Sequence, residues 1–284
     1  GDEVRIKKEL ERHGFSSDKI ILKHASEVIE MHDPAAISVR RKRDSSIVVG
    51  LDLIKKDQAD AFVSAGHTGA VVCAATLSLR LLQGIERPGI AIVIPTLKGT
   101  SLIIDVGANI NTKPIHLLQY GIMADAYSRY LPGKSNPSVG LLSVGEEGSK
   151  GTEFIKEAHM LLSESKLNFT GNIEGRDVYA GTVDIILCDG FVGNVILKIS
   201  ESVADTIMQI LKQEIKANFI ATIGAVLSSS AFNELKKKMD YSERGGALLL
   251  GVDGRCIICH GSSTPKAIKN AIRAAAEFVK QDVN

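Results

Sequence analysis

Short runs of hydrophobic residues recur along the chain, and most are followed by a glycine-containing turn and then a stretch of helical periodicity. β-branched runs of this length predict strands, and hydrophobic positions repeating every three to four residues predict helices. We expect strands at residues 19–22, 61–65, 89–95, 101–106, 138–144, 183–188, 247–251 and 256–259. We expect helices at residues 2–13, 45–56, 68–82, 114–130, 152–163, 193–217 and 265–279.

This alternation predicts an α/β fold, a three-layer α/β/α arrangement around a largely parallel sheet. Runs such as Ala-Ile-Val-Ile at 91–94 are hydrophobic at consecutive positions, as expected where helices cover both faces of the sheet. No repeat, low-complexity tract or Pro/Ser-rich linker divides the chain. We therefore expect one α/β domain over residues 1–284.

Five turns place glycine and polar side chains directly after a hydrophobic run, at residues 66–69, 105–109, 145–148, 189–194 and 260–264. Ligands bind beyond the carboxyl ends of strands in such sheets, and helix amino ends attract anions. Any one of these turns could be only a tight connection that needs positive φ. Together the five favour a site for an anion or phosphate.

The segment 215–239 has a helical pattern that differs from those of the other predicted helices. Residues Ile215, Phe219, Ile223 and Leu227 form one apolar stripe, and a second stripe follows a serine run, next to three consecutive lysines. Two helices packed in the core would explain the pattern. A projecting hairpin over residues 212–240, with apolar tips and a basic face, would explain it equally well.

The composition narrows the function classes. The chain has 284 residues, with Lys+Arg 34 against Asp+Glu 33 and a formal net charge of +1. This balance argues against a dedicated nucleic-acid binder. Residues 1–11 are rich in charged side chains, unlike a signal peptide. The longest apolar stretch, residues 219–227, is far shorter than the ~20 residues that a membrane-spanning helix needs. We expect a cytoplasmic protein.

The segment Cys256-Ile-Ile-Cys259-His260 has the spacing of a haem-attachment or metal motif. On a strand, however, residues three apart point to opposite faces, so the two sulfurs should diverge. We interpret these two cysteines, with Cys73 and Cys188, as packing residues, and we expect no metal and no cofactor.

Two kinds of side chain suit phosphate chemistry. The run Gly145-Glu-Glu-Gly-Ser-Lys150-Gly lacks the order of a P-loop, yet Lys150 beside a glycine-rich turn can hold phosphate as a point charge. A solvated lysine at a helix start is an equal explanation. His67 and His260 each follow a strand, and near pH 7 either can bind phosphate or act as an acid.

Six blocks carry a family resemblance: VSAGHTGA at 63–70, DVGAN at 105–109, GEEGSKG at 145–151, GNIEGRD at 171–177, CDGFVGNV at 188–195 and HGSS at 260–263. In this order, over nearly the whole chain, they resemble the PlsX-type phosphate acyltransferases. Two departures stand out. Members usually open with a strand and an Asp- and Gly-rich turn before the Gly-Asp-Glu found here at residue 1, and they usually have Asn where this chain has His67.

The resemblance implies transfer of a fatty acyl group from acyl-carrier protein to inorganic phosphate, giving acyl-phosphate for phospholipid synthesis. It also implies a homodimer, peripheral membrane contact, and a fold similar to the isocitrate and isopropylmalate dehydrogenases. Phosphate is already an anionic nucleophile, so the protein must orient it and stabilise the developing oxyanion.

On this basis we predict catalytic roles for His67, Lys150, Arg176 and His260, with the two cations neutralising phosphate and a histidine assisting the leaving thiolate. The predicted substrate- or phosphate-binding residues are Gly66, Thr68, Asp105, Asn109, Asn172, Asp189, Asn194 and Ser262. The predicted surface for the acidic carrier protein or the membrane comprises Lys212, Lys216, Phe219, Lys236, Lys237 and Lys238.

Other functions remain open at this point. One is a phosphotransacetylase-like or decarboxylating dehydrogenase-like enzyme, although no clustered Asp-x-x-x-Asp pattern supplies the metal site of the latter. Another is a non-catalytic protein that binds acyl-carrier protein or a lipid precursor.

Overall fold

The computed structural model describes residues 1–130, 134–239 and 245–280, and only the helical backbone of residues 236–239. The helices are α1 (Glu3–Arg12), α2 (Ala35–Arg41), α3 (Ser46–Lys55), α4 (Thr68–Ser78), α5 (Pro114–Ser128), α6 (Glu153–Ser163), α7 (Gly190–Ala217), α8 (Phe219–Leu227), α9 (Ser229–Met239) and α10 (Pro265–Lys280), with a 3-10 turn η1 (Gly175–Asp177). The strands are β1 (Ala61–Ser64), β2 (Gly89–Thr96), β3 (Gly99–Ile104), β4 (Ser138–Leu142), β5 (Asn168–Ile173), β6 (Ile185–Leu187), β7 (Ala247–Leu250) and β8 (Arg255–Ile258).

The strands form one sheet in the order β1-β8-β7-β2-β3-β6-β4-β5. The outer pairs are parallel, namely β1 with β8 and the run β3, β6, β4 and β5. In the centre β2 and β7 pair antiparallel with their neighbours. The mostly parallel sheet expected from the sequence is therefore confirmed, with an antiparallel join that the strand pattern did not reveal.

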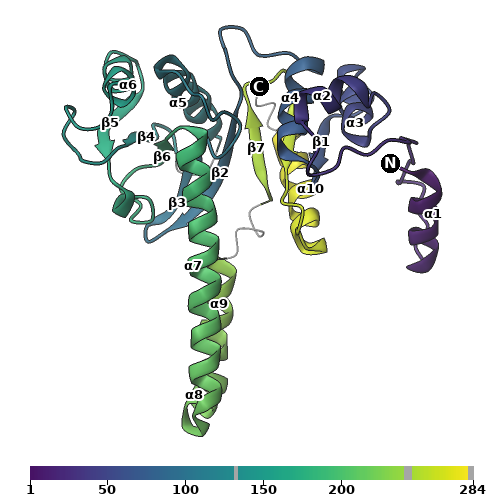
Figure 1. The fold of residues 1–284 in the computed structure, drawn as a ribbon. Helices are drawn as coiled ribbons and strands as arrows, with labels where there is room; N and C mark the ends of the chain where they lie inside the picture. The colour runs from purple at the N-terminus through teal and green to yellow at the C-terminus, as the bar shows by residue number, and fades with distance from the viewer. Residues whose placement is uncertain (131–133, 240–244, 281–284) are drawn as a thin grey trace.

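Helices cover both faces of the sheet, which confirms the three-layer arrangement (Figure 1). On one face Ile90, Ile103 and Ile186 pack with side chains of α3 and α4. On the other face Ala91, Leu102 and other strand residues pack with α5, α6 and α10. Burial on both faces explains why the strands are hydrophobic at consecutive positions.

Two predictions near the amino end differ from the structure. Residues 19–22 form a turn and irregular chain rather than a strand, and Ile21 is 90% exposed. An extended segment gains little without a neighbouring strand to satisfy its backbone groups, and none pairs with this segment in the described chain. The sequence reading also missed α2, a short helix held by the buried Ser38 and Val39.

The segment after β6 forms a projecting arm. Helix α7 extends well beyond the body of the molecule, α8 lies at the tip and α9 returns (Figure 1). Only Gly190 and Gly193 of α7 are buried, and no residue of α8 is. The arm is therefore the projecting hairpin and not a pair of core helices. It also begins earlier than residue 212, because most of α7 belongs to it.

The cysteines pack as expected. Cys256 lies in the core cluster on one face of the sheet and Cys259 in the cluster on the other face. Burial raises the pKa of the Cys256 thiol to about 12 and raises that of Cys259 as well. The divergence of the two sulfurs excludes them as a shared metal or haem site.

Candidate active site

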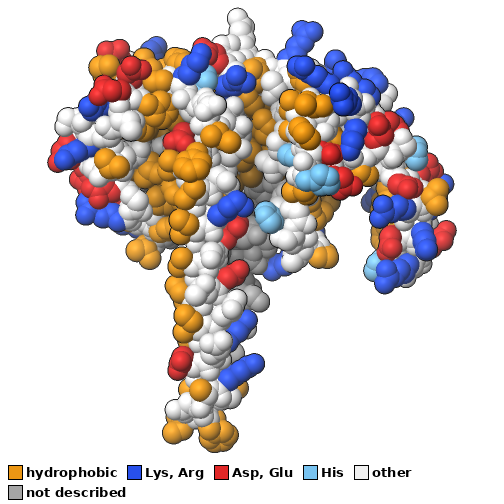
Figure 2. Space-filling view, in the orientation of Figure 1, with side chains coloured by type: hydrophobic (Ala, Val, Ile, Leu, Met, Phe, Trp, Pro, Cys, Tyr) orange, Lys and Arg blue, Asp and Glu red, His pale blue; other side chains and the backbone are white. Residues whose placement is uncertain are grey.

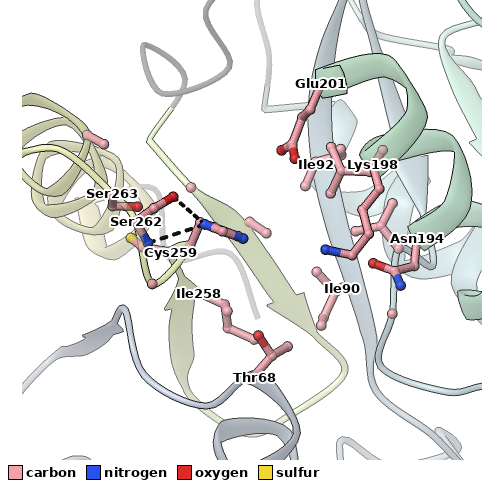
Figure 3. Close-up of a pocket in the computed structure, with 18 of the residues that line it drawn as sticks. Thr68, Ile90, Ile92, Asn194, Lys198, Glu201, Ile258, Cys259, Ser262 and Ser263 are labelled. Carbon is pink, nitrogen blue, oxygen red and sulfur yellow. Dashed lines mark hydrogen bonds between the residues drawn. The ribbon is translucent and has the colours of Figure 1, made fainter. Parts of the chain in front are cut away.

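A cleft of about 590 Å³ crosses the face of the sheet between α4 and α7. Ile90 and Ile92 of β2, with Ile258 of β8, form part of its apolar floor (Figure 3). Polar groups come from three places on its rim: the start of α4, the inner face of α7, and the turn after β8. An apolar cleft of this size with few convergent polar groups is typical of a ligand site.

The α7 wall supplies the positive charge of the cleft. Asn194, Lys198 and Glu201 lie on one side of the helix at spacings of four and three residues. Figure 3 shows Lys198 extending from α7 into the cleft, with Glu201 one turn further along. The sequence analysis selected Asn194 but not Lys198, although the Asn194-to-Lys198 spacing on a predicted helix was the available signal.

The turn after β8 forms the opposite wall. His260, Ser262 and Ser263 line the cleft there, and Figure 3 shows Ser262 and Ser263 on the side facing α7. The Ser262 hydroxyl lies 2.6 Å from His260 Nδ1, and the Ser262 backbone N–H donates to the same nitrogen at 3.3 Å. Because an N–H can only donate, Nδ1 accepts and the proton resides on Nε2, where the ring is a hydrogen-bond donor.

Asp105 lies beneath the cleft and shapes one of its edges. Its Oδ1 accepts from the backbone N–H groups of Ile90, Gly107 and Ala108 at 2.9–3.0 Å, and Oδ2 accepts from Asn109 N–H at 2.8 Å. Burial raises the pKa of this carboxyl despite the four donors. Asp105 therefore organises the turn that brings Gly107 to the cleft and does not itself reach the cavity.

Two further predicted residues act as structural supports. The Asn109 amide donates to the Tyr120 hydroxyl at 2.8 Å and to the Pro88 carbonyl. Asp189 caps α7 by accepting from the backbone N–H groups of Phe191 and Val192. Neither side chain lines the cleft, yet the cap fixes where α7 begins and so where Lys198 lies.

His67 caps the helix that follows it. Its Nδ1 accepts from the Ala70 backbone N–H at 3.2 Å, and Nε2 lies 3.1 Å from the Asp33 carbonyl oxygen. Both ring nitrogens are thus engaged, with the proton on Nε2 donated to Asp33. An amide oxygen at this position would accept the same helix N–H, so His in place of Asn preserves the cap. The neighbouring Gly66 and Thr68 do line the cleft.

Lys150, Arg176 and Asn172 lie outside the lining of this cleft. Arg176 pairs with Glu146 at 2.8 Å and Glu174 at 3.4 Å on the exposed surface. Asn172 donates to the Glu147 carbonyl at 3.0 Å and thereby supports the glycine-rich turn that contains Lys150. The structure thus brings Gly66, Thr68, Asn194, His260 and Ser262 together around the cleft. Lys150, Arg176 and Asn172 lie apart from it, and the roles of all these residues stay predictions.

The hairpin residues are distant from the cleft. Lys212, Lys216 and Phe219 lie toward the end of the arm, and Phe219 is 80% exposed. The side chains of Lys236, Lys237 and Lys238 lie outside the described residues. Within the described ranges, no group of three or more His, Cys, Asp or Glu side chains is placed to hold a metal ion, and no helix is long and apolar enough to cross a membrane.

Comparison with known proteins places the chain in a family. A family model described as "Fatty acid synthesis protein" matches residues 1–284. A phosphate acyltransferase of Geotalea uraniireducens (strain Rf4) is 51% identical over 284 residues, which are 100% of this chain and 82% of the relative. A phosphate acyltransferase of Geobacter sulfurreducens is 48% identical with the same coverage.

Solved structures show the same fold at low identity. A phosphotransacetylase from Staphylococcus aureus superposes with a TM-score of 0.63 at 15% identity, covering 98% of this chain and 84% of that one. A phosphotransacetylase from Streptococcus pyogenes gives the same TM-score at 16% identity, covering 99% and 85%.

Proposed function

The chain belongs to the fatty acid synthesis protein family, the PlsX-type phosphate acyltransferases, and from this premise we propose that it transfers a fatty acyl group from the thioester of acyl-carrier protein to inorganic phosphate. The products are an acyl-phosphate and the free carrier thiol. The observation that carries the proposal is the apolar cleft in which Lys198 faces the His260–Ser263 turn.

Phosphate binds on the polar rim in this proposal. The Lys198 ammonium neutralises part of its charge, and the Ser263 hydroxyl donates a hydrogen bond from the opposite wall. The amino end of α4, an 11-residue helix, adds backbone N–H groups near Gly66 and Thr68. This assigns to Lys198 the phosphate-binding role that the sequence analysis gave to Lys150 and Arg176.

The acyl transfer then proceeds by direct displacement. A phosphate oxygen attacks the thioester carbonyl carbon, the tetrahedral oxyanion collapses, and the carbon–sulfur bond breaks. In this proposal His260 donates its Nε2–H to the oxyanion or to the departing thiolate, since Nδ1 accepts from Ser262. The Asn194 amide is a second donor on the facing wall.

The apolar floor receives the start of the acyl chain. Ile90, Ile92, Val106 and Ile258 present hydrocarbon surface directly beside the polar rim. Each buried methylene contributes about 0.8 kcal/mol, so a chain of a few carbons on this floor gains substantial affinity. The apolar floor suits the fatty acyl chain, and the polar rim next to it suits the phosphate that attacks the thioester.

The hairpin supports the expected homodimer and membrane contact. Val195, Ile199, Val203, Ile207 and Ile210 form a stripe along one side of α7, with side chains 37–58% exposed. Figure 2 shows hydrophobic side chains along this side of the arm and at its tip. We assign the stripe to packing against a second copy, and the tip around Phe219, Ile220 and Leu227 to a bilayer surface.

The proposal is tested by incubating the protein with acyl-carrier thioester, and in a parallel reaction with acyl-coenzyme A, and measuring free thiol with and without phosphate. Acyl-phosphate is trapped separately as its hydroxamate. Phosphate-dependent thiol release with equal hydroxamate supports the proposal. Binding without release points to a non-catalytic carrier-binding protein, and release only from acyl-coenzyme A points to a phosphotransacetylase-like enzyme.

A further inference from the structure

A basic surface lies beside the cleft, on the outer face of α2. The segment 35–43 contains Arg40, Arg41, Lys42 and Arg43 and no acidic residue. Ser38 and Val39 turn inward, whereas Ile37, Arg40 and Arg41 are exposed on the opposite side of the helix. Figure 2 shows Lys and Arg side chains gathered where Figure 1 labels α2 and α3.

The surface continues onto α4. Helix α2 packs against α4; burial raises the pKa of the Cys73 thiol on α4, and the positive charge of Arg40 on α2 partly opposes this. Leu77 lies one turn after Cys73 on α4, and Arg80 follows in the turn just after the helix, which ends at Ser78; both side chains are exposed. The two packed helices thus each expose one large apolar side chain, Ile37 (52% exposed) on α2 and Leu77 (50% exposed) on α4, in addition to the arginines.

The exposed arginines of this surface have no carboxylate partner among the described residues. In the described ranges Lys42 pairs with Asp33, but no carboxylate lies within 4 Å of Arg40, Arg41 or Arg80. Three unpaired guanidinium groups around exposed apolar side chains match the composition of a protein-binding surface for an acidic partner.

The position of the surface relates it to the cleft. Met31 lines the cleft and lies just before α2, and α2 packs against the start of α4, where Gly66 and Thr68 line the cleft. Lys212 of the hairpin instead lies about 16 Å beyond Glu201 along α7, at about 1.5 Å per residue. From Lys198 to Ala217 the charges of α7 also balance, three lysines against three acidic residues.

We propose that the α2–α4 surface, defined as Ile37, Arg40, Arg41, Leu77 and Arg80, is the docking site of the acidic acyl-carrier protein. This inference rests on the proposed function and names the surface to which the acyl donor of that reaction binds. The carrier docks with its acidic face on the arginines and an apolar contact on Ile37 and Leu77. Its flexible thioester arm then enters the cleft past Met31.

The test is a charge reversal, Arg40→Glu with Arg41→Glu. The KM for acyl-carrier thioester should rise about ten-fold or more at low salt, with kcat at saturation unchanged. The difference should shrink at about 1 M NaCl. Turnover of a short acyl thioester of N-acetylcysteamine, which lacks the carrier, should equal wild type. Arg5→Glu with Lys8→Glu on α1 makes the same four-unit charge change elsewhere and should leave all values unchanged.

Direct binding is measured with fluorescently labelled carrier protein by anisotropy, so the docking surface is tested even without turnover. Loss of binding in the α2 variant alone supports the proposal. Equal binding by the α2 variant and wild type overturns it, as does loss confined to Lys212→Glu with Lys216→Glu. Failure of the proposed function appears differently, as a wild-type protein that never releases thiol in a phosphate-dependent way.

Discussion

Replacement of Gly193 by alanine tests how closely α7 packs against the turn beneath the cleft. A Cβ at this position would overlap the Asp105 carbonyl oxygen and would lie 2.9 Å from its carbonyl carbon and 3.0 Å from Cys188 Sγ. Carbon atoms in favourable contact are about 3.5–4.0 Å apart, so the helix start must move by on the order of 1 Å. The obstacle is backbone, which cannot rotate away.

Two consequences follow from that movement. Overpacking of this kind costs about 1–3 kcal/mol of unfolding free energy. Displacement of α7 also moves Asn194 and Lys198, and a misplacement of about 1 Å can lower the rate about 10²-fold. We therefore expect Gly193→Ala to remain folded but less stable, with kcat/KM for phosphate reduced by about two orders of magnitude.

Urea unfolding and the phosphate-dependent thiol assay measure the two effects. The matched control is Gly224→Ala in α8, where nothing lies within 4 Å of the added Cβ. That change should stabilise the helix by up to about 1 kcal/mol and leave activity unchanged. A Gly193→Ala protein with wild-type stability and kinetics would refute the packing argument.

Three further predictions follow from the contacts described above. Asp105→Asn should lower the unfolding free energy by about 1–3 kcal/mol in urea, because an amide cannot accept four backbone N–H groups; an unchanged midpoint would contradict this. The pKa of Asp184 is lowered overall, because the hydrogen bonds from Lys134 and Ser138 outweigh the opposite effect of burial. Wild type should therefore be more stable than Asp184→Asn at pH 7. The difference should disappear as the pH falls below about 4, because the hydrogen bonds that lower the pKa stabilise only the ionised carboxylate. A stability difference that does not change with pH would be inconsistent with this reasoning. Lys150→Ala and Arg176→Ala should each raise the KM of phosphate less than Lys198→Ala does, because neither residue lines the cleft. A larger effect at Lys150 or Arg176 would indicate that this residue, as predicted from the sequence, binds the phosphate.

The fold could be predicted largely from the sequence because hydrophobic runs and helical periodicity are local signals. The antiparallel pairing of β2 with both β3 and β7 could not, since strand order depends on contacts distant in sequence. Residues 19–22 have a strand-like composition but no neighbouring strand in the described chain, so local propensity was misleading there.

The site was only partly predictable for a related reason. The glycine turns after strands pointed to Gly66, Thr68, His260 and Ser262, which the structure places along the cleft; their roles stay predictions. Lys198 lies two turns inside a long helix and is exposed to solvent, as a helical lysine ordinarily is, so only the position of α7 beside the cleft shows that it lines the cavity. Other polar residues of these turns, such as Asp105, accept hydrogen bonds from the turn backbone and lie outside the cleft lining.

The central claim is that Lys198 holds the phosphate that attacks the thioester. The most direct measurement is the phosphate dependence of acyl-phosphate formation, trapped as hydroxamate, in wild type, Lys198→Ala and Lys198→Arg. We predict a steep rise in the KM of phosphate for Lys198→Ala and partial recovery in Lys198→Arg, which keeps the charge. An unchanged phosphate KM in Lys198→Ala would contradict the account.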